Sequence, residues 1–147
     1  MSASCFAQLE GERPVLLPPG NYDVEFVGFA TSMLFTKAYK LRLQFKVVTM
    51  GEHFGTHISR FYNVTRLIGR VGQNGRFKVG FHSDFLREFS TLFGTPVRLD
   101  RIPMTSFERK ILLARVRTVE KAGTPPRWIP EGLRYSVISE LITVKEG

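Results

Sequence analysis

The segment from Tyr39 to Val48 reads YKLRLQFKVV, and apolar and polar side chains alternate along it. Successive side chains of a β-strand point to opposite faces, so this pattern predicts a strand; a helix would spread both kinds around its circumference. One face collects Tyr39, Leu41, Leu43, Phe45 and Val47 and belongs to a core. The other collects Lys40, Arg42, Gln44 and Lys46, at intervals of about 6.6 Å. This cationic row is either ordinary solvated surface or a surface that follows a phosphate backbone.

The chain has 147 residues, of which 43% are hydrophobic, enough to close one core without disulfides or a metal. Residues 1–20 are small, polar and punctuated by proline, so we expect an N-terminal arm there and a single domain over residues 21–147. We find no apolar run of about 18 residues that would span a membrane, and no secretion signal. Together with the single cysteine, Cys5, these features predict a cytoplasmic protein, in the host cytoplasm if a phage encodes it.

The net charge is +8, and the excess lies in the middle of the chain. Residues 37–117 carry sixteen Lys or Arg against five acids, whereas residues 1–36 have a balance of −3 and residues 118–147 a balance of zero. Fourteen of the 21 cations are arginine, whose planar guanidinium suits phosphate oxygens and stacks on aromatic rings. This distribution favours a polyanionic partner. The alternative is a charge that only keeps the protein soluble.

The segments on either side of the first stretch also carry strand patterns. Residues 21–29 alternate like a first strand, with a bend or bulge expected at Gly28. Residues 30–38 form a connection whose large apolar residues either tuck under it or stay outside to touch something. A third strand follows at 56–64. Its two faces are equally mixed, so the sequence leaves open which one points inward.

The second half begins with a Gly-rich basic ribbon at 65–81, where the pair Asn74-Gly75 predicts a hairpin turn. The apolar period then becomes that of an amphipathic helix over 83–93, which is expected to cover one side or end of a sheet. A strand follows at 108–119. Arg115 and Arg117 there continue the parity of the apolar residues Ile111 and Leu113, so we expect a bulge or an exit from the core near Ala114. A Pro- and Gly-rich loop at 121–134 and a last strand at 135–144 complete the order.

This order, three strands, one helix and two strands, resembles the OB-fold, a five-stranded Greek-key barrel with one α-helix between strands 3 and 4. The segment from Leu17 to Val48, a Pro-Gly lead into a strand followed by LRLQFKVV, is also similar to single-stranded-DNA-binding proteins of phages and mobile elements. The resemblance implies a mainly β fold that binds oligonucleotides through its second and third strands and two flanking loops. Phe35 would lie in the first of these loops and Trp128 in the second. The sequence ends ITVKEG, where bacterial housekeeping members of that class usually carry an acidic tip that recruits partners. We expect this departure to bear on partner recruitment and not on strand binding.

A sequence-tolerant site for single strands needs cations for the phosphates and exposed rings for the bases. The cations that we expect there are Lys37, Lys40, Arg42, Lys46, Arg60, Arg66, Arg70, Arg115, Arg117 and Arg127. The rings are Phe35, Phe54, Tyr62 and Trp128, although each ring also suits a core. The sequence thus predicts a non-enzymatic single-stranded-DNA-binding protein of replication or recombination, without a cofactor or a membrane partner. The same chemistry serves RNA, and a homodimer is compatible with it.

Two other classes of protein fit parts of the sequence. A structural or protein-interaction barrel, such as a virion or assembly component, would turn the basic side to an acidic partner. A metal-dependent nuclease would use Asp100 with the acid and lysine of Glu108-Arg109-Lys110, a spacing that is common by accident. His53 and His57 stand four residues apart but flank a turn and lack further ligands at metal-site spacing.

Overall fold

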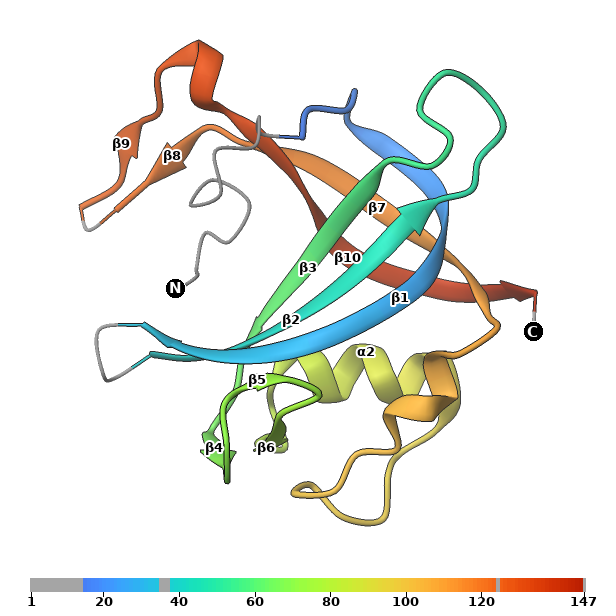
Figure 1. Cartoon of the computed structure of the whole chain (residues 1–147), viewed down its shortest axis with the longest axis vertical. Coiled ribbons are helices and arrows are strands. Elements are labelled where there is room, and N and C mark those ends of the chain that lie inside the picture. Colours follow the sequence, from blue (N-terminus) through green and yellow to red (C-terminus); the bar gives the residue numbers. More distant parts are fainter. Residues whose placement is uncertain (1–14, 35–37, 124, 147) are drawn as a thin grey trace.

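The computed structural model describes residues 15–34, 38–123 and 125–146, and the protein is mainly β. Its long strands are β1 (Gly20–Leu34), β2 (Ala38–Val47), β3 (His57–Asn63), β7 (Ile111–Val119) and β10 (Tyr135–Glu146). Helix α2 (Asp84–Phe93) lies between β3 and β7 in the chain, which confirms the predicted order of the long elements (Figure 1). The short elements are β4 (Arg66–Ile68), β5 (Gly72–Gln73), β6 (Arg76–Lys78), β8 (Lys121–Ala122), β9 (Arg127–Trp128) and the 3-10 helices η1 (Met104–Phe107) and η2 (Glu131–Leu133).

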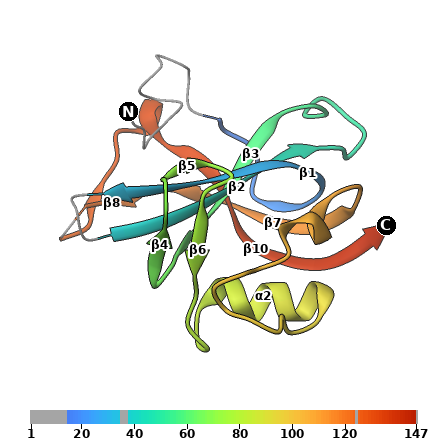
Figure 2. The ribbon, with the colours of Figure 1, turned by 60° about the horizontal axis from the view of Figure 1, so that its bottom comes forward.

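The long strands form one antiparallel sheet in the order β10–β7–β1–β2–β3. The sheet is strongly curved, and its outer strands β3 and β10 approach each other where α2 packs against both (Figure 1, Figure 2). No hydrogen-bonded register joins β3 to β10 in the part of the chain that the structure describes. The predicted mainly β architecture is therefore confirmed as a large curved antiparallel sheet, with one α-helix among the residues that the structure describes.

Strand β2 has the alternation that its sequence predicts. Leu41, Leu43, Phe45 and Val47 are fully buried, while the residues between them are only half-buried. Burying such a side chain contributes about 1.5–3 kcal/mol relative to leaving it exposed. One face of β2 therefore fixes the register of the central sheet, because a slip by one residue would turn this whole row to the solvent.

Strand β1 is longer than predicted. It continues through residues 30–34, which were expected to form a connection, and pairs there with the start of β2. The expected irregularity at Gly28 is confirmed, since the β1–β2 register shifts between Phe26 and Gly28. Of the apolar residues expected in the connection, Met33 is 47% exposed.

The structure settles the inward faces of β3 and β7. Ile58 and Tyr62 of β3 are buried, so the opposite parity of that strand faces out. The bulge or exit from the core that the sequence predicts near Ala114 of β7 is wrong. The strand is regular and alternates buried Leu112, Ala114 and Val116 with exposed arginines, and the register shifts lie in β10 instead.

Helix α2 follows its sequence signals closely. Its start is capped by Ser83, whose hydroxyl accepts a hydrogen bond from the Leu86 N–H at 3.1 Å, and Gly94 ends it with a φ of 93°. The apolar side of the helix packs against β3 and β10. Its Phe89 also contacts Phe107 of η1 edge-on, at a distance of 5.7 Å between the ring centres. Among the described residues, no helix is long and apolar enough to cross a membrane.

Residues 15–20 belong to the folded body, although the sequence placed them in an arm. Leu17 is 2% exposed, and its N–H donates to the Ser136 hydroxyl at 2.8 Å. The Ser136 N–H in turn donates to the Val15 carbonyl at 2.7 Å. Residues 15–20 are therefore not part of an arm, and the first fourteen residues lie outside the described part of the chain.

Candidate nucleic-acid interface

The outward side of the β2–β3 pair forms the surface that we call the sheet face. It consists of four cross-strand pairs: Lys40 with Asn63, Arg42 with Phe61, Gln44 with Ser59, and Lys46 with His57. The strands place these side chains in register because each directly opposed pair of an antiparallel ladder points to the same side. From Lys40 to Lys46 the sheet face extends for roughly 20 Å. It brings together three of the cations that the sequence predicted: Lys40, Arg42 and Lys46.

Polar neighbours hold these three cations along the strands. The Lys40 ammonium donates to the side-chain oxygen of Asn63, a neutral partner. Arg42 Nε donates to the Ser59 hydroxyl at 3.0 Å. Lys46 lies 3.7 Å from the Glu25 carboxylate, and this pair is largely exposed. Because its neutral partner leaves the charge of Lys40 in place, this end of the sheet face stays electropositive.

Phe61 is the aromatic residue on the sheet face, and the sequence prediction missed it. It is 39% exposed and lies directly opposite Arg42. The sequence signal for it is that Phe61 shares one face of β3 with polar residues. This signal is ambiguous because each face of the strand carries an aromatic residue. Only the burial of Tyr62 decides that the face with Phe61 points outward.

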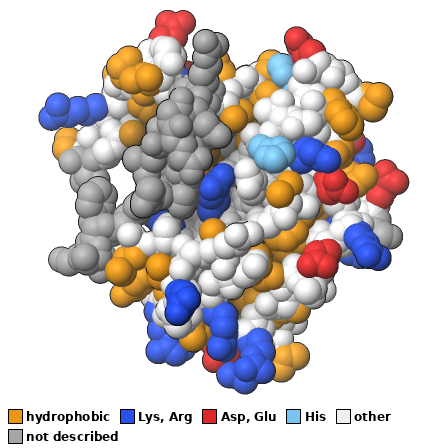
Figure 3. Space-filling model, viewed as in Figure 1, with side chains coloured by type: hydrophobic (Ala, Val, Ile, Leu, Met, Phe, Trp, Pro, Cys, Tyr) orange, Lys and Arg blue, Asp and Glu red, His pale blue; other side chains and the backbone are white. Residues whose placement is uncertain are grey.

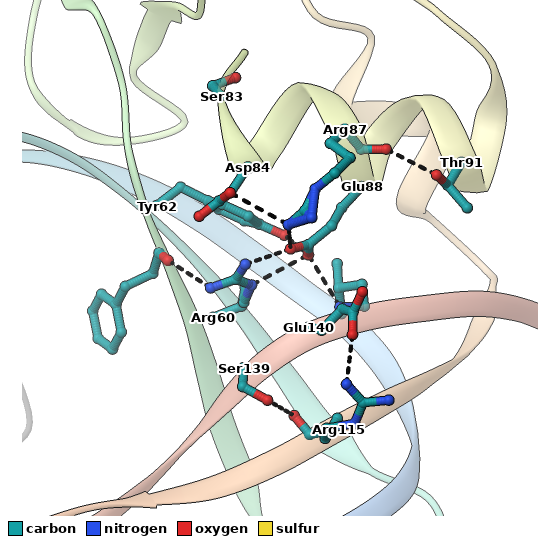
Figure 4. A network of polar contacts seen from close by, with 12 residues as sticks. Arg60, Tyr62, Ser83, Asp84, Arg87, Glu88, Thr91, Arg115, Ser139 and Glu140 are labelled. Atoms are coloured by element: carbon teal, nitrogen blue, oxygen red, sulfur yellow. Dashed lines mark hydrogen bonds and ion pairs between the residues drawn. The ribbon is translucent and has the colours of Figure 1, made fainter.

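Arg60 and Tyr62, predicted to bind nucleic acid, lie on the inward face of β3, and this is a correction. Tyr62 is 3% exposed and the Arg60 side chain 11%. Both contact Glu88 of α2, which is itself buried (Figure 4). The sequence could not reveal this, because the acid that pairs with Arg60 comes from a helix 28 residues further along the chain. Their polar groups serve the attachment of the helix.

The carboxylate of Glu88 is fully used by its neighbours. Its Oε1 accepts from Tyr62 Oη at 2.7 Å, from Arg60 Nε at 3.2 Å and from the Leu141 N–H at 3.0 Å. Its Oε2 accepts from the Arg60 guanidinium. Burial, together with the negative charge of Glu88, raises the pKa of Tyr62 well above its usual value. Burial alone would lower the pKa of Arg60, but the hydrogen bond to Glu88 and the interactions with the charges of Tyr62 and Glu88 together outweigh it, so that this pKa is raised.

Arg66 and Arg70 belong to a second basic surface, formed by β4, β6 and the loop between them. We call the four exposed cations there, Arg66, Arg70, Arg76 and Lys78, the basic ribbon. In the register of β4 with β6, Arg66 stands opposite Lys78. Lys and Arg side chains gather at the lower edge of the molecule, over these strands (Figure 3). The predicted basic ribbon therefore exists, but Asn74-Gly75 joins β5 to β6 and does not turn β4 directly into β6.

Trp128 and Arg127 lie on the β8–β9 hairpin, which projects from the same end of the sheet as the β1–β2 hairpin (Figure 1, Figure 2). Trp128 is 65% exposed, as a stacking residue must be. Lys121 Nζ lies 4.4 Å from the centre of its ring and the Arg134 guanidinium 5.6 Å. This ring is thus exposed and flanked by cations.

The remaining predicted residues do not converge with these. Arg115 pairs with Glu140 at 2.7 Å, and Arg115 and Arg117 point outward from β7. Asn21, the β1 partner of Arg115, and Ser32, the β1 partner of Lys40, are separated by roughly 36 Å of strand. Phe54 is 54% exposed in the turn between β2 and β3. Phe35 and Lys37 lie outside the described residues. The predicted cations are therefore divided among several surfaces.

Two of the residues considered for a metal site, Asp100 and His57, contact other side chains. Both oxygens of Asp100 accept from the Arg98 guanidinium, at 2.9 and 2.8 Å, and this hydrogen bonding lowers the pKa of Asp100. His57 Nδ1 lies 3.3 Å from the Gln44 amide. The described residues contain no group of three or more His, Cys, Asp or Glu that could hold a metal ion.

Comparison with known proteins found no match among protein-family models, curated proteins or solved structures. The functional interpretation therefore depends on the surfaces themselves.

Replacing Glu88 with Gln is expected to lower the free energy of unfolding by about 3 kcal/mol or more, because it leaves Arg60 with its charge buried and unpaired. Urea denaturation measures this. Asp84→Asn is the matched control, since Asp84 is an exposed acid on the same helix, and its loss should cost under about 1 kcal/mol. Equal losses in the two variants would contradict the structural role of Glu88.

The raised pKa of Tyr62 predicts that stability falls at alkaline pH. Above about pH 10 a tyrosine in the unfolded chain loses its proton while folded Tyr62 keeps it, so the folded state binds more protons and loses stability as pH rises. Between about pH 9 and 11 the free energy of unfolding of the wild type should decline by about 1.4 kcal/mol more than that of Tyr62→Phe. Denaturation curves between about pH 9 and 11 test this; parallel declines would refute it.

Proposed function

We propose that this protein binds single-stranded DNA without sequence preference, along the sheet face, in DNA replication or recombination. The observation that carries the proposal is the exposed ring of Phe61 directly opposite Arg42, with Lys40 on the same surface. An unpaired strand presents phosphates and base faces together, and a surface that alternates cations with a ring can contact both. Stacking on such a ring is worth about 1–3 kcal/mol per base.

The arrangement of strands supports the same proposal. Five long strands with a helix after the third follow the element order of the OB-fold, whose strands 2 and 3 and adjoining loops bind oligonucleotides. Here the second and third strands are β2 and β3, which make the sheet face. The β8–β9 hairpin joins the fourth and fifth strands and carries Trp128. We therefore propose an OB-like barrel in which this hairpin supplies a second stacking ring.

A single strand suits these surfaces better than a duplex does. Proteins that read duplex DNA commonly insert a helix into the major groove. In the described part of the chain the one α-helix packs its aromatic residues against the sheet, and its exposed residues Asp84, Arg87 and Thr91 carry no net charge. The exposed rings of Phe61 and Trp128, in contrast, lie on a strand and a hairpin, where bases without partners can reach them.

Phe61→Leu is expected to weaken binding of an oligothymidine by roughly five- to 150-fold, since it keeps apolar bulk but removes the stacking ring. Phe61→Tyr keeps a ring and should bind nearly as the wild type does. The salt dependence of binding should be the same in all three proteins, because no cation changes. Fluorescence anisotropy over a range of salt concentrations measures both quantities.

Failure of the wild type to bind oligothymidine at low salt would end the nucleic-acid proposal and leave a protein-interaction barrel as the alternative. Parallel titrations with RNA and duplex DNA of the same length measure the preference among nucleic acids.

Trp128 provides an independent signal, because its indole fluorescence should be quenched when a base stacks on it. Trp128→Ala is expected to weaken oligothymidine binding more than Trp128→Phe does, since only the latter retains an aromatic face. Titrations of the wild type by fluorescence and of both variants by anisotropy give the comparison. Identical affinities of the two variants would place the indole outside the interface.

A further inference from the structure

The four cations of the basic ribbon are exposed and unneutralised by the rest of the described chain. Within residues 15–34, 38–123 and 125–146, none of Arg66, Arg70, Arg76 and Lys78 forms an ion pair. Arg66 and Lys78 stand directly opposite each other on two strands. Like charges in such a pair destabilise a sheet, so the arrangement costs the free protein stability that a bound anion would restore.

The basic ribbon is held firmly by the core beneath it. Phe77, on the other face of β6, is 4% exposed and contacts Phe85 of α2 edge-on at 5.5 Å. The loop of the ribbon is fastened at Thr31 of β1, whose hydroxyl accepts from the Gly72 N–H at 3.2 Å. Gly75 approaches the same hydroxyl so closely that a Cβ there would lie 2.1 Å from it. The cations therefore project from a fixed support.

Arg70 and Arg76 border a surface hollow at the tip of the ribbon. Gln73 and Asn74 line the same hollow. Two arginines and two residues with side-chain amides around one hollow provide donors from several directions. Guanidinium forks bind phosphate oxygens in pairs, so the hollow is chemically suited to a phosphate group.

The hollow continues the sheet face across a single strand. Ala30 of β1 pairs with Arg42 on one side and with Gln73 of β5 on the other. Neighbouring strands lie about 4.8 Å apart, so the backbone of the hollow is roughly 10 Å from that of Arg42. The β1 residues that share the outward side there are Gly28, Ala30 and Ser32. Because these residues are small, we expect a low saddle between the two surfaces.

We propose that the basic ribbon is a second contact for the same single strand. The DNA crosses β3, β2 and the saddle on β1, and the ribbon then binds its phosphate backbone, with Arg70 and Arg76 on one phosphate in the hollow. This inference rests on the proposed function of the sheet face. It adds that the single-stranded DNA runs across the sheet toward the basic ribbon. It also adds that the ribbon contacts the DNA through charge and not through stacking.

The test compares wild type, the double variant Arg70→Gln/Arg76→Gln and a control, Arg115→Gln/Lys145→Gln. The control removes the same charge from two exposed cations that already pair with Glu140 and Asp23. For a 16-nucleotide oligothymidine, the slope of the logarithm of the binding constant against the logarithm of the salt concentration should become shallower by about 0.7 for each phosphate released. For one phosphate, this corresponds to a loss of about fivefold in affinity at 0.1 M salt. For a short oligothymidine of about 4 nucleotides, near the lower limit for one OB-fold, it should bind as the wild type does.

Lys78→Gln supplies a second variant with an opposite pair of effects. Removing one of the two like charges should raise the melting temperature of the free protein by about 1 °C, while binding of the 16-nucleotide oligothymidine weakens. A residue with only a structural role would lower both. Circular dichroism confirms that each variant is folded before binding is measured.

The outcomes separate the two proposals. If the wild type binds neither oligonucleotide at low salt, the proposed function fails, and this inference fails with it. If the wild type binds but the ribbon variant keeps the full salt slope, or loses no more affinity than the control, the sheet face stands and the ribbon is not a contact.

Discussion

The position of helix α2 against the two outer strands of the curved sheet depends on the hydrogen bonds that the Glu88 carboxylate accepts. The carboxylate accepts hydrogen bonds from Tyr62 and Arg60 of β3 and from the Leu141 N–H of β10, two strands that share no ladder in the described chain. A buried charge is tolerated only when an opposite charge and hydrogen bonds surround it. Glu88 meets this condition only if helix and both strands are in place, so the polar network specifies one position for α2 while its phenylalanines provide the apolar burial.

Strand β2 has two roles that its alternating sequence keeps apart. Its inward row is buried without exception from Leu41 to Val47 and fixes the register of β1 and β3. This register then places each outward cation opposite a defined residue of β3, such as Asn63 or Phe61. The core thus determines the spacing of the surface that we propose for binding, because both rows belong to one backbone.

Local patterns predicted much of this fold correctly. The alternation of β2, the Ser83 cap and Gly94 stop of α2, and the irregularity at Gly28 all arise from interactions between residues near in sequence, which a pattern records. The bulge or exit predicted for β7 is wrong because the prediction placed Ile111 and Leu113 in the core, and Arg115 and Arg117 lie on the same side of the strand as these two residues. Their strand instead turns the smaller row of Leu112, Ala114 and Val116 inward. Side-chain size alone did not reveal which row had room beneath it.

By itself the sequence determined a mainly β chain, its one amphipathic helix, its basic centre and the cationic row of β2. These follow from side-chain period and charge, which need no partner. Only the tertiary structure decided that Arg60 and Tyr62 face a buried acid while Phe61 faces out. It also decided that Arg115 pairs with Glu140, and that Gln73 in the loop of the ribbon lies across β1 from Arg42. The physical reason is that each depends on a residue far along the chain, whose proximity is created by folding.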